Sequence, residues 1–394
     1  MKMGLSWNGI LAAYGELALK SKTVRRRFVR KLISNIETGL SNIGVKARVA
    51  HRWSRILVET EDVELALKVL KRVFGLVYVS PYYFVKLDRL EEFIAENSVK
   101  LVEGAESFAV RVRRTGRHSF TSIDLERRLG TIVKGKTGLR VSLDNPDRTV
   151  FVEVHDDECY VYNEKLEAPG GLPLGTAGKV VALVSTGIDS PVASWLMMRR
   201  GCSVTVLHAW ISGMDTDPCS RKFIDLVEVL RSWHIGVDMP VYVYRHGDAL
   251  KVIREAASNY TCILCKRLMA RVAEKLAERI GAKAIVTGEN LAQVASQTLE
   301  NLYAIDAATE IPILRPLIGF DKDETVELAR KLGTYEISVR MDPGCSARDV
   351  CWGKPPKPVT KAKLEKVLML EETIQAERLV ENALDTLEEL HGCL

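Results

Sequence analysis

The chain has 394 residues, enough for two or three domains, and carries a net charge of +5. No apolar run reaches the roughly 18 residues of a membrane span, and the first residues are too weakly apolar for a signal peptide. We therefore expect a cytoplasmic protein with no membrane association. Residues 1–173 carry 29 basic against 22 acidic side chains, whereas residues 174–394 carry 27 against 29. A basic N-terminal half suggests a polyanionic partner, although a solvated basic surface would give the same balance.

The first eighty residues predict a compact mixed domain. The expected elements are a strand and turn over 9–20, a helix over 25–40, strands over 45–49 and 55–58, a helix over 63–73 and a strand over 77–84. Their β-α-β-β-α-β order is typical of a ferredoxin-like fold.

A second mixed segment follows over about residues 85–170. Helices are expected over 90–101 and 122–134, and strands over 108–114 and 149–154. The strand at 108–114 alternates apolar and basic residues, which predicts a strand with one wet, basic face. The run Ala-Pro-Gly-Gly-Leu-Pro at 168–173 is the clearest linker in the chain.

The C-terminal half alternates apolar strands with helices. Strands are expected over 179–184, 203–208, 240–244, 283–287 and 311–314, and the tail over 360–390 predicts one or two amphipathic helices. This order indicates an open, mostly parallel sheet wound with helices, a doubly wound α/β fold. Ligands of such sheets lie at the carboxyl ends of the strands.

A loop of small polar residues, Ser185-Thr186-Gly187-Ile188-Asp189-Ser190, joins the first of these strands to a helix with Pro191 in its first turn. Free backbone N–H groups and the helix dipole make such a junction an anion cradle. The pattern S-x-G-x-D-S is not a Walker A sequence. It resembles the pyrophosphate loop of enzymes that cleave ATP between the α- and β-phosphates.

Each loop residue has an expected role in that chemistry. Ser185 and Ser190 would donate hydroxyl hydrogen bonds to phosphate, Gly187 would contribute its backbone, and Asp189 would face the Mg²⁺ that neutralises departing pyrophosphate. Thr186 stands where most relatives have glycine. Its hydroxyl adds a donor if φ is negative there, but a positive φ would strain it.

The eight cysteines include one close pair, Cys262-Ile263-Leu264-Cys265. This spacing serves thiol redox chemistry, zinc or an iron–sulfur cluster, and Cys345 and Cys351 are available as more distant ligands. Buried thiols or a structural disulfide are the alternatives. Cys219 is not assigned by its sequence context.

Several segments together resemble one family, the tRNA 4-thiouridine synthetases, also called tRNA sulfurtransferases or thiamine-biosynthesis sulfur-transfer proteins. The matching segments, in collinear order over nearly the whole chain, are residues 14–20, 170–175, 185–193, 287–302, 315–319 and 333–338. The block Gln293 to Leu302 is long and unusual, so coincidence is a poor explanation.

The resemblance implies three domains: a ferredoxin-like domain (residues 1–80), a THUMP RNA-binding domain (81–170) and a PP-loop ATP pyrophosphatase domain (171–394). It implies a reaction in which ATP adenylates the C4 oxygen of a tRNA uridine, expected at position 8, and sulfur then displaces AMP. Because a carbonyl oxygen leaves poorly and an adenylate leaves well, this order of steps is chemically sound. The resemblance also implies a homodimer.

Site residues are carried over by motif. ATP contacts are expected at Leu183, Val184, Lys266, Gly288 and Gln297, together with His208 and Ala209. Cys262, Cys265 and Cys345 match a set that in short relatives holds an iron–sulfur cluster. Alternatively, Cys345 carries a persulfide that Cys262 or Cys265 resolves. We expect a short form without the rhodanese-like domain of longer relatives, with sulfide or a persulfide carrier as the donor.

The tRNA would be bound through basic residues of the N-terminal half. The candidates for phosphate contacts are Lys20, Lys22, Arg25, Arg26, Arg27, Arg111, Arg113, Arg114 and Arg117. Two other functions fit parts of the sequence: a PP-loop synthetase that adenylates another substrate, and a non-catalytic RNA-binding protein with a degenerate ATP domain.

Overall fold

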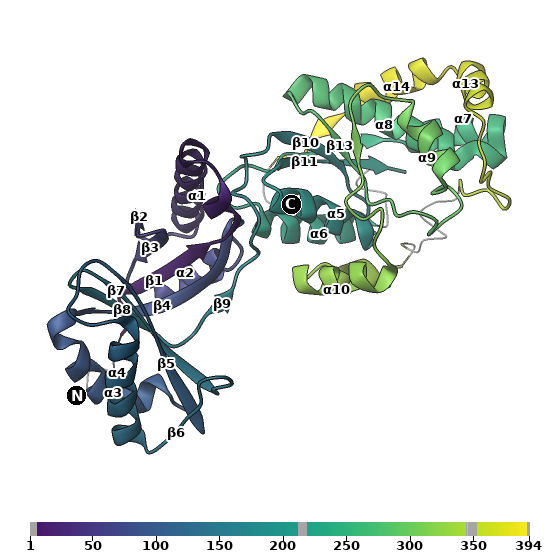
Figure 1. The fold of residues 1–394 in the computed structure, drawn as a ribbon. Helices are drawn as coiled ribbons and strands as arrows, with labels where there is room; N and C mark the ends of the chain where they lie inside the picture. Colours follow the sequence, from purple (N-terminus) through teal and green to yellow (C-terminus); the bar gives the residue numbers. More distant parts are fainter. Residues whose placement is uncertain (1–5, 212–218, 344, 346–352, 392–394) are drawn as a thin grey trace. The chain divides into compact units, whose positions relative to one another are not determined.

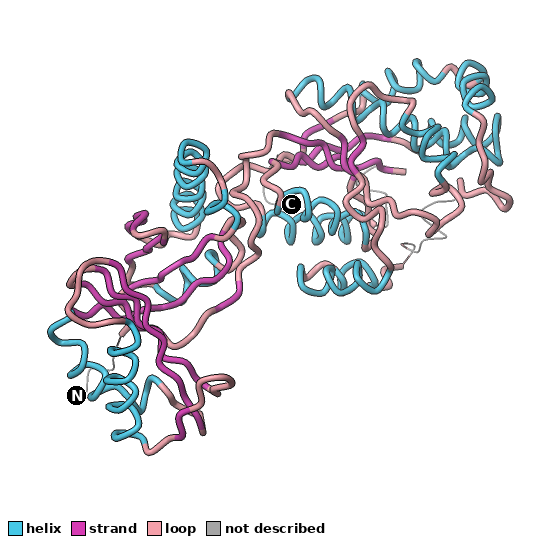
Figure 2. The backbone as a smooth tube through the Cα atoms, viewed as in Figure 1, coloured by secondary structure: helices cyan, strands magenta, loops and turns pink. Residues whose placement is uncertain are grey.

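The structure, a computed structural model, describes residues 6–211, 219–343, 345 and 353–391. The chain divides into two compact units, residues 1–173 and 174–394. The break follows the Pro-Gly-Gly-Leu-Pro run expected to be a linker. Figure 1 shows the elements of each unit, and Figure 2 traces the same backbone by secondary structure.

The first unit is built on one large mixed sheet. Its elements are β1 (Gly9–Tyr14), α1 (Lys22–Asn42), β2 (Arg48–Arg52), β3 (Arg55–Glu59), α2 (Val63–Leu70), β4 (Leu76–Lys86), α3 (Leu90–Leu101), β5 (Ser107–Thr115), α4 (Ser122–Thr137), β6 (Arg140–Val141), β7 (Arg148–His155), β8 (Glu158–Tyr162) and β9 (Leu166–Glu167). The strand order is β2-β3-β1-β4-β8-β7-β5-β6, and β9 pairs with β4. The predicted ferredoxin-like order of the first six elements is therefore present.

Strand β4 belongs to both halves of this sheet. It pairs with β1 on one side through residues 76–82 and with β8 through residues 83–86. The expected domain boundary between residues 80 and 81 falls inside this strand, so no element ends there. Helices α1 and α2 contact the first half and α3 and α4 the second. The expected alternation of β5 is present only from Val110 to Arg113: Ser107 to Val110 are all buried, Arg111 is half-buried, Val112 is buried and Arg113 is exposed.

Strand β8 was not expected. Its sequence, Glu-Cys-Tyr-Val-Tyr, is buried at four consecutive positions and so lacks the alternation that marks a half-exposed strand. Both of its faces are covered: Cys159 and Val161 join the core under α3 and α4, whereas Tyr160 and Tyr162 pack against residues of β1 and β3.

The second unit is the doubly wound fold that the sequence predicts. Its elements are β10 (Lys179–Leu183), α5 (Asp189–Arg199), β11 (Ser203–Trp210), α6 (Ser220–Trp233), β12 (Val241–Arg245), α7 (Gly247–Ala257), α8 (Thr261–Ile280), β13 (Ile285–Val286), α9 (Leu299–Asp306), β14 (Ile313–Leu314), α10 (Lys322–Leu332), α11 (Tyr335–Val339), α13 (Leu364–Thr373), α14 (Ala376–Asp385) and β15 (Glu388–Glu389). The strand order is β14-β13-β10-β11-β12-β15, with every pair parallel except β12 and β15.

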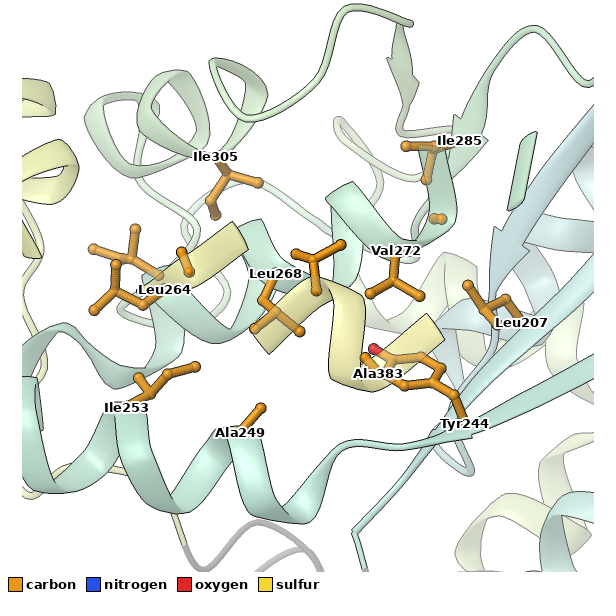
Figure 3. Close-up of a cluster of buried hydrophobic side chains, with 14 of the residues drawn as sticks. Leu207, Tyr244, Ala249, Ile253, Leu264, Leu268, Val272, Ile285, Ile305 and Ala383 are labelled. Carbon is orange, nitrogen blue, oxygen red and sulfur yellow. The ribbon is translucent and has the colours of Figure 1, made fainter. Parts of the chain in front are cut away.

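Helices cover both faces of this sheet (Figure 1). Helices α5 and α6 lie on one face with α10 against α5, and α8 and α14 lie on the other. Figure 3 shows the core under α8, in which Leu264, Leu268 and Val272 belong to one buried cluster with the strand residues Leu207 and Ile285. Burying each such side chain contributes roughly 1.5–3 kcal/mol, so this contact fixes α8 against the sheet.

One charged group lies inside that core. Arg267 of α8 is fully buried and makes two hydrogen bonds, of 2.8 and 2.6 Å, to the carboxylate of Glu371 in α13. A buried guanidinium needs such a partner because desolvating it unpaired is costly. The pair therefore ties the C-terminal helices to α8. Across the part of the chain that the structure describes, no helix is long and apolar enough to cross a membrane.

Candidate functional site: a nucleotide pocket at the carboxyl edge of the sheet

The loop between β10 and α5 is held in shape by its own serines. The Ser190 hydroxyl oxygen accepts a 2.8 Å hydrogen bond from the backbone N–H of Ser185, and the two serine hydroxyl oxygens lie 3.1 Å apart. Ser190 is buried, so part of its hydrogen-bonding capacity shapes the loop. Thr186 is not among the described non-glycine residues with positive φ, so threonine fits this position without strain.

A pocket of about 290 Å³ opens beside this loop. It lies where β10, β11, β13 and β14 end, the edge at which parallel sheets bind ligands. The predicted residues that line it are Leu183, Val184, Ser185, Gly187, Asp189, Ser190, His208, Ala209, Lys266 and Gly288. Sequence reasoning missed its other lining residues, Leu207, Met269, Ala270, Thr287, Glu289, Ile305 and Ile313. Apolar walls around one polar loop suit an adenosine with its phosphates.

Gly288 follows β13 and lies against the loop. A Cβ atom at this position would lie 2.6 Å from the backbone nitrogen of Ser190 and 2.7 Å from the carbonyl carbon of Asp189. Neither contact can relax without moving the loop backbone. Glycine is therefore required for the close approach of the two segments, as the motif implied.

Lys266 reaches the pocket from α8 and is held by a buried carboxylate. Its ammonium lies 2.8 Å from Glu289 and 3.0 Å from the Ser296 hydroxyl. Arg315 binds the other oxygen of Glu289 at 2.8 Å. Burial alone would raise the pKa of Glu289, but the Lys266 and Arg315 charges outweigh it and lower the pKa. Glu289 therefore stays ionised and fixes the direction of the lysine.

His208 of β11 closes the pocket beside the strand end. Its Nδ1 lies 2.6 Å from the Val184 carbonyl oxygen, and since a carbonyl can only accept, Nδ1 carries the proton. The ring stacks on Phe223 at a centroid distance of 4.1 Å. His208 thus links β11 to the end of β10 at the place where an adenine would lie.

Two residues that the sequence did not indicate meet at Asp189. The ammonium of Lys322, the first residue of α10, lies 2.6 Å from one carboxylate oxygen. The side-chain amide of Gln293 lies 3.4 Å from the other. Gln293 belongs to the block that carried the family resemblance, but nothing in the local sequence around Lys322 could have indicated it.

Two expected nucleotide contacts lie outside the lining of the pocket. Thr186 is in the loop but does not line it, and Gln297 is buried in the turn that follows Glu289. The Gln297 side-chain oxygen accepts a 3.1 Å hydrogen bond from the backbone of Val294. In this geometry Gln297 shapes the turn, and its contact with a nucleotide stays a prediction.

The structure groups the cysteines differently from the expected set. Cys345 is joined by a disulfide to Cys219, the residue immediately before α6. Cys262 and Cys265 lie together at the start of α8, where Cys265 Sγ is 3.0 Å from Nε2 of the buried His246. The spacing of the cysteines could not reveal this pairing, because contacts of α6 with Ser338 and Arg340 bring the segment that contains Cys345 to Cys219. Cys351 lies outside the described residues.

This arrangement does not fit a cluster held by three thiolates. The Cys345 sulfur is bonded to Cys219, so of the three expected ligands only Cys262 and Cys265 are outside a disulfide. Among the residues described, no group of three His, Cys, Asp or Glu side chains is placed to hold a metal ion. At Asp189 the nearest positive charge is Lys322.

The predicted phosphate contacts lie in two places on the first unit. Lys20, Lys22 and Arg25 surround the start of α1, and Arg111, Arg113, Arg114 and Arg117 lie on β5 or just after it. Arg25 donates to the Lys20 carbonyl at 3.2 Å, and Arg111 donates to the Leu143 carbonyl. These two guanidinium groups therefore also hold local structure, whereas Arg113 and Arg117 are exposed.

Fold and pocket together define a class of protein. A small polar loop of this type at the carboxyl edge of a doubly wound sheet is typical of PP-loop ATP enzymes. Comparison with family patterns matches the ThiI ferredoxin-like domain at residues 9–80, the THUMP domain at 87–164 and the thiamine biosynthesis protein ThiI at 175–376. The chain belongs to the ThiI family, which confirms the resemblance and the fold class expected from the sequence.

Relatives match over the full length. A probable tRNA sulfurtransferase of Methanothermobacter thermautotrophicus is 42% identical over 383 residues, covering 95% of this chain and 97% of the relative. A crystal structure of a 4-thiouridine synthetase–RNA complex with bound ATP is 31% identical with a TM-score of 0.87, covering 98% of this chain and 100% of that one. The structure of PH1313 from Pyrococcus horikoshii is 25% identical with a TM-score of 0.67, covering 83% of this chain and 99% of that one.

Proposed function

We propose that this chain is an ATP-dependent tRNA sulfurtransferase that converts a tRNA uridine to 4-thiouridine. The observation that carries the proposal is the pocket at the PP-loop. It is supported by relatives that match along nearly the whole chain and are named as a probable tRNA sulfurtransferase and a 4-thiouridine synthetase. We expect the uridine at position 8, a finer assignment that rests on the family resemblance alone.

Different residues of the pocket are assigned to the phosphates and to the adenine of ATP. The loop N–H groups and Lys266 bind the phosphates, while the strand ends at Leu183 and Val184 and the His208 ring border the adenine. Adenylation develops negative charge on the departing pyrophosphate, which Lys266 and Lys322 are placed to offset. Mg²⁺ bound with ATP would supply further positive charge, and the single carboxylate of Asp189 suits an ion that a nucleotide brings with it.

Sulfur delivery is assigned to the cysteines of the second unit. We propose that the Cys345 thiolate takes the outer sulfur of a persulfide carrier, which leaves as a thiolate. The terminal sulfur of the Cys345 persulfide then attacks the activated C4 atom and displaces AMP. Cys262 or Cys265 attacks Cys345 Sγ, which forms a disulfide and releases the 4-thiouridine. Cys265 is supported in this role by its contact with His246, since a nearby imidazole is a typical partner of a reactive thiol. An iron–sulfur cluster on these thiols requires Cys345 to be released from Cys219, so we route no step through one.

The first unit is proposed to hold the tRNA through its basic residues, in a cytoplasmic enzyme that acts as a homodimer. Exposed Arg113 and Arg117, and Lys22 at the start of α1, are the side chains best placed for phosphate contacts. Such contacts would position the RNA by its shape.

The test follows adenylation and thiolation separately. Purified chain is incubated with tRNA, ATP, Mg²⁺ and a persulfide carrier, and pyrophosphate release and thiouridine in nuclease digests are measured. We expect tRNA-dependent pyrophosphate release from the wild type and its loss in Asp189→Asn. The variant Asp323→Asn, one residue beyond Lys322 on exposed α10, is the matched control. Pyrophosphate release that ignores tRNA would contradict an RNA substrate and favour a synthetase for another substrate.

A further inference from the structure

The disulfide between Cys219 and Cys345 joins α6, whose Phe223 stacks on the pocket residue His208, to the segment that follows α11. Cys219 precedes α6 and Cys345 follows the α11 segment, and their Cα atoms are 5.1 Å apart. The two residues are 126 positions apart in sequence. A bond between them therefore joins the segment around Cys345, which follows α11, to the start of α6.

The same segment is tied to α6 and to the PP-loop by polar contacts. Arg340 binds Asp225 of α6 at 2.7 Å, and buried Lys222 of α6 donates to the Ser338 carbonyl at 3.4 Å. The Ser338 hydroxyl in turn donates to the Gly187 carbonyl of the loop at 3.3 Å. These contacts keep Cys345 close to Cys219 whether or not the sulfur atoms are bonded.

Bonding to Cys219 changes what Cys345 can do. A thiol in a disulfide can neither carry sulfur nor ligate iron, so one bond removes Cys345 from either form of sulfur delivery. The adenylating groups lie on other elements and keep their geometry. The chain therefore has a way to stop thiolation while leaving ATP chemistry intact.

We propose that Cys219 is the redox partner of Cys345 and that their disulfide is a reversible lock on sulfur delivery. The proposal rests on the proposed function, in which Cys345 delivers sulfur. It assigns a role to a cysteine outside the C-x-x-C pair and its expected third member. Reduced protein thiolates, and oxidised protein only adenylates.

The exchange balances as ordinary thiol–disulfide chemistry. In closing, the Cys345 thiolate attacks a low-molecular-weight disulfide and displaces one thiolate, and Cys219 then attacks Cys345 Sγ and displaces the second. Two cysteines lose two electrons, and the small disulfide gains them. In opening, a dithiol reverses both steps and becomes a cyclic disulfide. Cys219 is suited to this exchange because a helix N-terminus stabilises a thiolate.

The test uses the full chain, oxidised with diamide or reduced with dithiothreitol, then freed of reagent. Diamide takes two electrons and two protons from a pair of thiols and becomes a hydrazine. Peptide mapping without reduction measures the Cys219–Cys345 bond, while tRNA-dependent pyrophosphate release and thiouridine formation with a persulfide carrier as donor are followed in parallel. For the oxidised wild type we expect a linked peptide, pyrophosphate release within about twofold of the reduced protein, and at least tenfold less thiouridine, restored by dithiothreitol.

The decisive variant is Cys219→Ser. Serine is favourable at the residue before a helix, so this variant should fold. We expect it to thiolate like reduced wild type and to be insensitive to diamide. Cys202→Ser, which removes another buried cysteine of the same unit, should keep the wild-type sensitivity.

Three outcomes would overturn the lock. They are absence of the linked peptide, full thiolation by the linked protein, and equal inactivation of Cys219→Ser by diamide. If the native protein kept the Cys219–Cys345 bond in dithiothreitol and still formed thiouridine, the bond would be a structural disulfide and the lock would be wrong. Failure of the proposed function is distinguishable, because fully reduced wild type would then make no thiouridine, whatever the peptide map shows.

Discussion

Each unit contains a buried carboxylate held by cations, and the two networks serve different ends. In the first unit Glu153 of β7 accepts hydrogen bonds from the Arg55 guanidinium at 2.9 Å and from the Tyr162 hydroxyl at 3.1 Å. In the second unit Glu289 binds Lys266 and Arg315. Only Glu289 lines the nucleotide pocket. Burial by itself therefore does not mark a functional charge, and the position at the carboxyl edge of a parallel sheet does.

The cations that bind Glu153 and Glu289 also differ in the hydrogen bonds that they would keep if the carboxylate were removed. Arg55 is mostly buried and otherwise donates only a long 3.4 Å bond to Ser54, among the hydrogen bonds described. Arg315 also binds Asp306 at 2.6 Å, and Lys266 also binds Ser296. Without Glu289, Arg315 and Lys266 would each keep a described polar partner, whereas without Glu153, Arg55 would keep only the long bond to Ser54 among the bonds described.

The largest expected effect is therefore on stability in the first unit. Glu153→Ala leaves the Arg55 guanidinium buried without its carboxylate, which should cost about 3–5 kcal/mol of unfolding free energy. Glu289→Ala should cost at least about 1 kcal/mol less and instead weaken ATP binding. Hydrogen-exchange mass spectrometry separates the two units, and calorimetry measures ATP affinity. Equal destabilisation by the two variants would break the comparison.

A pH titration sharpens the same contrast. Burial would raise the pKa of Glu153, but the His155 ring 3.5 Å away, the Arg55 charge and the Arg55 hydrogen bonds lower it from 4.5 to about 2. A carboxyl group whose pKa is lower in the folded than in the unfolded state stabilises the folded state at pH values above the unfolded pKa. This stabilisation is lost as the pH falls through the folded pKa. We expect about 3 kcal/mol of first-unit stability to disappear between about pH 4.5 and pH 2. Urea unfolding of the wild type and of Glu153→Gln at several pH values measures this loss of stability. If the free energy of unfolding depended on acid pH in the same way in both proteins, Glu153 would not be its cause.

The smallest effect concerns the pocket alone. In Gly288→Ala the new methyl group meets the loop backbone at Ser190, so the loop must shift at a cost of about 1–3 kcal/mol. We expect roughly tenfold to hundredfold weaker ATP binding with little change in the first unit. Gly130→Ala in α4, where a Cβ meets nothing within 4 Å, is the control and should leave ATP binding unchanged. Unaltered ATP affinity in Gly288→Ala would mean that the loop does not bind the phosphates.

Much of the fold could be predicted because its signals are local. The helix over residues 90–101 was expected at its observed bounds, since apolar spacing is read within one segment. The PP-loop was also predictable, because strand, loop and helix N-terminus are contiguous and each has its own residue preferences. Gly288 could be named because a motif carries the requirement for a close backbone approach.

Contacts between distant segments were decided only by the tertiary structure. Lys322 meets Asp189, Glu289 orients Lys266, and Cys345 bonds to Cys219 through packing that brings separate helices to one sheet edge. Strand β8 escaped prediction for a related reason, since its two buried faces are covered by elements from both halves of the first sheet. Local sequence states the preferences of a segment, and the partner of a side chain depends on which segments the fold places beside it.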